Sequence, residues 1–69
     1  MDSKLKSRRI ASGYTQSQLS EASGVNIKSI ALYEQNPDRL SKASVMSVIR
    51  IADCLGCSVE DIIDRSLMG

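Results

Sequence analysis

Apolar side chains recur along the chain at intervals of three and four residues, which is the spacing of amphipathic helices. The strict alternation typical of half-buried strands is nowhere sustained. Helix start and stop signals divide the pattern into five predicted helices, at about residues 4–12, 15–23, 27–35, 44–55 and 58–63. We therefore expect an all-α fold of five helices, formed as a single domain over residues 1–69.

Capping residues predict the positions of the helix ends more accurately. Thr15, followed by Gln18, is a capping box, and Asn26 is a favoured N-cap for the next helix. The sequence Asn-Pro-Asp at 36–38 is turn chemistry, so we expect a loop over about residues 36–43. Ser58 with Asp61 predicts a second capping box. In the helix that opens at Ser44, the expected inward stripe is Val45, Val48, Ile49, Ala52 and Leu55.

The segment from Thr15 to Glu34 has the spacing of two short helices that meet at a tight turn. Gly24 supplies the left-handed backbone with which one helix ends and the chain reverses within about three residues. The residues expected to face inward are Leu19, Ala22, Ile30 and Tyr33. This pattern predicts a helix-turn-helix motif at about residues 15–35, an arrangement whose second helix enters the major groove of DNA.

Composition excludes several classes of function. The chain has no His and only two aromatic residues, which disfavours His-based catalysis, most zinc sites and base-stacking platforms. With no glycine-rich phosphate loop and no carboxylate pair in an apolar setting, we predict no enzyme, no cofactor and no small-molecule substrate. No apolar run approaches the roughly 20 residues that span a bilayer, and no signal peptide is present. We expect a cytoplasmic protein without membrane contact.

Charge is unevenly distributed although the net charge is only +1. Residues 1–28 contain five basic and two acidic side chains, whereas residues 51–69 contain one basic and four acidic side chains. A chain with a basic front can present one face to phosphate despite being nearly neutral overall.

Cys54 and Cys57 have the CxxC spacing, but their expected position is unfavourable for redox or metal chemistry. Redox pairs lie at a helix N-terminus, where the helix dipole lowers the thiol pKa. These two flank a predicted helix C-terminus at Leu55-Gly56. A zinc site would need two more ligands, so packing as small apolar residues is the favoured interpretation and we predict no metal.

Together these residues resemble the phage-repressor/Cro-type, or XRE-type, helix-turn-helix family. The resemblance covers about residues 4–64 and rests on Arg9 with G-Y-T-Q at 13–16, L-S-E-A-S-G-V at 19–25, and Tyr33-Glu34. It implies a lambda-repressor-like five-helix domain that binds double-stranded DNA sequence-specifically. It further implies a transcriptional regulator, which we expect to be a repressor acting as a homodimer on a palindromic operator.

The family pattern also implies roles for individual residues. The base-facing positions are Asn26, Ile27, Lys28, Ala31 and Leu32. The expected phosphate contacts are Gln16, Ser29, Gln35, Asn36 and Lys42. Arg9 and Glu34 match an internal ion pair between the first and third helices, and Arg9 shares the inward stripe with Leu5, where a guanidinium needs a partner. Asn36 stands where the family usually has Gly, and the following Pro37 favours extended backbone.

Ile27 and Leu32 occupy base-facing positions that are often polar, and three interpretations stay open. They could contact thymine methyl groups in a T-rich site read partly through DNA shape. They could form a protein-binding surface, as in an antitoxin-like or decoy regulator that uses the same helix face. Alternatively, the segment 36–43 could partly cover them, in which case their assignment as base-facing positions would be wrong.

A dimer contact is expected to come from the domain itself. The chain ends soon after the last predicted helix, so we expect no separate sensor or dimerisation domain. The expected dimer contact is an apolar patch near the C-terminus, formed by Ile62, Ile63, Leu67 and Met68.

Overall fold

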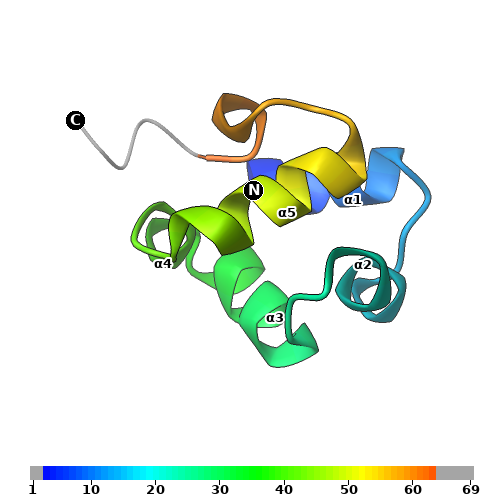
Figure 1. Ribbon diagram of the computed structural model, residues 1–69, viewed down its shortest axis with the longest axis horizontal. Coiled ribbons are helices and arrows are strands. Elements are labelled where there is room, and N and C mark those ends of the chain that lie inside the picture. Colours follow the sequence, from blue (N-terminus) through cyan, green and yellow to red (C-terminus); the bar gives the residue numbers. More distant parts are fainter. Residues whose placement is uncertain (1–2, 64–69) are drawn as a thin grey trace.

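The computed structural model describes residues 3–63. Over this range the chain forms α1 (Lys4–Ala11), α2 (Gln16–Ser23), α3 (Ile27–Gln35), α4 (Pro37–Ser41), α5 (Val45–Leu55) and a 3₁₀ turn, η1 (Val59–Asp61). No strand occurs within the described residues, so the predicted all-α fold of five helices is confirmed. In Figure 1, α5 crosses the middle of the molecule, with α4 near one end and the chain toward η1 leaving from the other.

The predicted caps explain where the helices of the central motif begin and end. Thr15 and Gln18 form the capping box of α2, and the Asn26 side chain accepts a 2.8 Å hydrogen bond from the Lys28 N–H at the start of α3. Gly24 ends α2 with a φ of 76°, a conformation that costs glycine little. The helix-turn-helix arrangement is thus present, with α2 packed on α3.

Every helix contributes to one apolar core. Its buried members are Leu5, Leu19, Val25, Ile30, Leu40, Val48, Ile51, Ala52, Leu55 and Ile62. Ile30 is fully buried on the inner side of α3, and Val25 is buried in the turn before it. The core therefore fixes how α3 is presented to solvent.

Two elements differ from the sequence prediction. The expected loop at 36–43 contains the five-residue helix α4, and the expected last helix is only the three-residue turn η1. Pro37 occupies the first position of α4, where its fixed φ suits a helix and its missing N–H removes no hydrogen bond. Leu40, only 1% exposed, anchors α4 in the core. Asn36 has φ −128° and ψ 84°, outside the helical region that Pro37 disfavours for the residue before it.

The inward faces of α2 and α5 were predicted only in part. Ala22 is exposed, and the buried position belongs to Ser23, whose hydroxyl donates a 2.7 Å hydrogen bond to the Leu19 carbonyl. Val45 and Ile49 are 70% and 37% exposed. The buried stripe of α5 is instead Val48, Ile51, Ala52 and Leu55. Because α5 is apolar on two sides, its spacing allows both stripes, and packing against α2 and η1 selects one.

The expected C-terminal dimer patch also differs from the sequence prediction in the burial of its residues. Ile62 is fully buried and belongs to the core, and Ile63 is partly buried against it. Leu67 and Met68 lie outside the described residues. Of the part of this patch that can be described, Ile62 is therefore core, whereas Ile63 stays partly exposed.

Asp61 caps the start of η1 and also pairs with a side chain on α1. Its carboxylate accepts hydrogen bonds from the Ser58 N–H at 3.1 Å and the Ser58 hydroxyl at 3.0 Å, which is the predicted capping box. The bond from the Ser58 N–H is the main reason that the pKa of Asp61 lies below its usual value, and Arg8, 3.6 Å away, lowers this pKa further. The Asp61 carboxylate thus keeps its charge to lower pH than usual and pairs with Arg8 on α1.

Candidate nucleic-acid interface

A guanidinium–carboxylate pair holds α3 to α1. The Arg9 Nε donates to the Glu34 Oε2 at 2.7 Å, and a second guanidinium nitrogen donates to Oε1 at 3.2 Å. The two side chains are only 11% and 4% exposed, so this two-point pair is largely removed from water. A third donor of Arg9 reaches the Tyr14 carbonyl at 2.8 Å. One side chain therefore connects α1, the turn after α1, and α3.

Gln16 extends this arrangement to the start of α2. Its side-chain nitrogen donates to the Glu34 Oε1 at 3.1 Å, and the residue is half-buried. The N-terminus of α2 therefore lies beside the C-terminal part of α3. The sequence did not reveal this bond, because it joins residues 18 positions apart whose side chains meet only in the folded chain. The capping box takes the backbone N–H groups of Thr15 and Gln18, so those of Gln16 and Ser17 are the ones at the start of α2 that have no acceptor within the helix.

The five base-facing positions lie together on α3 and its N-cap. Lys28 is exposed, Ile27 and Leu32 are 42% and 41% exposed, and Ala31 is half-buried. The side-chain oxygen of Asn26 is occupied by the cap. Ile27 and Leu32 keep this exposure with α4 in place, so the segment at 36–43 leaves both side chains open to solvent.

The positions expected to contact phosphate do not form one cluster. Gln35 and Asn36 are exposed at the C-terminal end of α3, near the start of α2 where Gln16 lies. Lys42 is exposed at the C-cap of α4. Ser29, half-buried, lies in the first turn of α3, at the opposite end of that helix. The exposed members of the expected phosphate-contacting set thus lie at the C-terminal end of α3 and on the adjoining α4.

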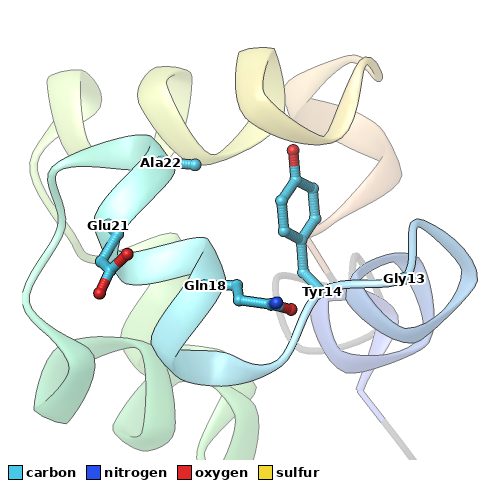
Figure 2. A pocket seen from close by; sticks show the side chains of 5 residues that line it. All are labelled: Gly13, Tyr14, Gln18, Glu21 and Ala22. Carbon is cyan, nitrogen blue, oxygen red and sulfur yellow. The ribbon is translucent and has the colours of Figure 1, made fainter.

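An open hollow of about 430 Å³ lies beside α2, at the turn after α1. Figure 2 shows the Tyr14 ring extending from this turn toward α5, with Glu21 farther along the hollow. Interaction with the Cys54 side chain is the main cause that raises the pKa of Tyr14 above its usual value. The Glu21 carboxylate disfavours phosphate in this hollow.

The cysteines behave as packing residues. Both thiols are free and half-buried against the core. Burial raises the pKa of Cys57, the direction opposite to that of an activated thiol. Within residues 3–63, no group of three or more His, Cys, Asp or Glu side chains is arranged to hold a metal ion.

The helix-turn-helix family model matches residues 5–62, which is most of the chain. The chain therefore belongs to the XRE-type helix-turn-helix family of Cro and repressor-like proteins. This is a family of DNA-binding regulators rather than of enzymes. No curated protein and no solved structure gave a significant match to the chain. Among the described helices, none has the length and apolar character needed to cross a membrane.

Proposed function

We propose that this protein is a cytoplasmic transcriptional repressor that binds a palindromic operator in double-stranded DNA sequence-specifically. It acts by occupancy: each protomer inserts α3 into a major groove. The observation that carries the proposal is the outward face of α3, where Lys28 is exposed while the Arg9–Glu34 pair holds the helix to α1. The free N–H groups at the start of α2 suit a phosphate on the strand beside the groove. Gln16, Ser29, Gln35, Asn36 and Lys42 remain the proposed phosphate contacts.

Lys28→Ala is expected to weaken operator binding by about 1–3 kcal/mol and to relax preference at one base pair, because Lys28 is the cation of the base-facing set. The operator is first selected from a random duplex pool, and binding is then measured by fluorescence anisotropy at several salt concentrations. The logarithm of the affinity should fall with the logarithm of the salt concentration, with a slope of about −0.9 per phosphate neutralised.

Lys4→Ala is the matched control for this measurement. Its ammonium donates a 2.8 Å hydrogen bond to the Glu60 carbonyl on η1, and it belongs to α1 rather than to the helix-turn-helix. Equal losses in Lys4→Ala and Lys28→Ala would indicate only a general charge effect. Binding that does not change with salt would contradict the proposal.

The homodimer is proposed to form through an apolar face at the start of α5. Val45 and Met46 are 70% and 58% exposed there. Beside them is a groove of about 130 Å³ whose lining has no charged residue: Leu40, Ser41, Ala43, Val45, Val48, Ile49, Val59 and Ile63. A second copy related by a two-fold axis would place the apolar lining of one groove against that of the other. Such an axis is also what a palindromic operator requires.

Met46→Glu is expected to weaken the dimer by about tenfold or more, because association would then desolvate a carboxylate. Sedimentation equilibrium measures the dimer dissociation constant. Ile10→Glu, at a 54% exposed apolar position on α1, serves as the control and should leave the constant unchanged. A Met46→Glu protein that dimerises like the parent would rule out this face.

A protein partner is the second candidate function, and the exposure of Ile27 and Leu32 on α3 favours it. A protein-binding module of this kind would select no duplex in the experiment above. It would instead bind another protein, which would co-purify with it, and Leu32→Ala would abolish this co-purification.

A further inference from the structure

The outer face of α3 is apolar at both edges and cationic between them. On a helix with about 100° between successive residues, Ile27, Lys28 and Leu32 lie at about 0°, 100° and 140° around the axis. Ala31 falls inside the same arc, so this face combines one ammonium with three apolar groups. Ile30 points the other way and is fully buried, which fixes the rotation of the helix about its axis.

This face offers few hydrogen bonds to base edges. The Asn26 oxygen, which could otherwise read a base, accepts the bond from the Lys28 N–H. An apolar side chain set against the major-groove edge of adenine, guanine or cytosine would remove water from polar groups without replacing their hydrogen bonds. A C5-methyl group on a pyrimidine is the apolar feature that this groove presents. Thymine and 5-methylcytosine both have that methyl group.

We infer that Ile27 and Leu32 determine specificity by packing on the C5-methyl groups of two thymines. These thymines lie on either side of a guanine that Lys28 contacts. This inference rests on the proposed function. The two apolar residues are five positions apart, which is about 7.5 Å along a helix axis and roughly two base-pair steps of 3.4 Å. Each half-site therefore has two thymine positions whose methyl groups contribute to affinity.

Atomic substitution in the DNA tests this inference directly. The wild-type protein first selects its operator from a random duplex pool, and each thymine is then replaced in turn by deoxyuridine, which lacks only the methyl group. We expect a loss of about threefold to fivefold at two positions of each half-site, the worth of one buried methyl group. Substituting cytosine and then 5-methylcytosine at those positions isolates the methyl group a second time and measures whether 5-methylcytosine also serves.

Protein variants assign each methyl group to a side chain. Ile27→Ala should remove the sensitivity to deoxyuridine at one position and Leu32→Ala at the other, whereas Ile10→Ala on α1 should keep both. All three side chains are exposed, so the variants should fold, which circular dichroism checks. If wild-type protein selects an operator but tolerates deoxyuridine throughout, or if Ile27→Ala and Leu32→Ala keep full sensitivity, the inference is wrong while the proposed function stands. If no duplex is selected, both fail and the protein-binding interpretation replaces them.

Discussion

Arg9→Ala is expected to lower the free energy of unfolding by about 3–5 kcal/mol, the cost of breaking a buried ion pair on one side. The substitution would leave the Glu34 carboxylate, only 4% exposed, with the single remaining bond from Gln16 at 3.1 Å. It would also remove the bond from the guanidinium to the Tyr14 carbonyl. Urea denaturation followed by circular dichroism measures the loss.

The matched control is Arg8→Ala, one position along the same helix. Arg8 lies 3.6 Å from Asp61, with the side chains 49% and 42% exposed, so its removal should cost at most about 1 kcal/mol. A double variant, Arg9→Met with Glu34→Leu, should regain most of the lost stability because neither side chain then needs a charge partner. Similar losses in Arg8→Ala and Arg9→Ala would contradict the role given to the buried pair.

Ile51→Ala is expected to cost about 2–5 kcal/mol, because it would leave a cavity in the apolar core. Ile51 is fully buried on the inner side of α5, facing the contacts with α2 and η1. Thermal and urea unfolding of the purified variant measure the change, and the midpoint should fall with little change in the denaturant dependence.

Ile49→Ala provides the comparison, since it makes the same chemical change two residues earlier on the same helix. Ile49 is 37% exposed, so its truncation should cost no more than about 1 kcal/mol. The difference between the two variants reports which stripe of α5 faces the core. A larger loss in Ile49→Ala would favour the stripe expected from spacing alone.

Helix ends were predictable from sequence because local chemistry decides them. The boxes at Thr15 and Ser58, the cap at Asn26 and the left-handed Gly24 each act within about four residues. The inward stripe of α5 could not be chosen in this way, because two apolar stripes fit its spacing and only the positions of α2 and η1 distinguish them. The short α4 was missed because Asn-Pro-Asp is also compatible with a turn, and the burial of Leu40 is a tertiary effect.

In the candidate site, too, some features could be predicted from the sequence and others depended on the folded structure. The resemblance supplied both the expected base-facing positions along α3 and the partner of Arg9. The Tyr14 carbonyl and Gln16, which complete the environment of this ion pair, were not foreseen. Both contacts depend on how the turn after α1 lies against α3, and no pattern in the sequence encodes that distance.

The solvent-facing residues of α3 are different from those that hold the helix in place. This difference bears on how the proposed DNA preference of the protein could change. Ile27, Lys28 and Leu32 face solvent, whereas Ile30 and Glu34 make the contacts that hold the helix in place. Exchanging the first three should leave folding nearly untouched, because surface substitutions usually alter stability by less than about 0.5 kcal/mol. The preference of the proposed DNA-binding face could therefore drift, or be engineered, through a few codons while the rest of the chain stays constant.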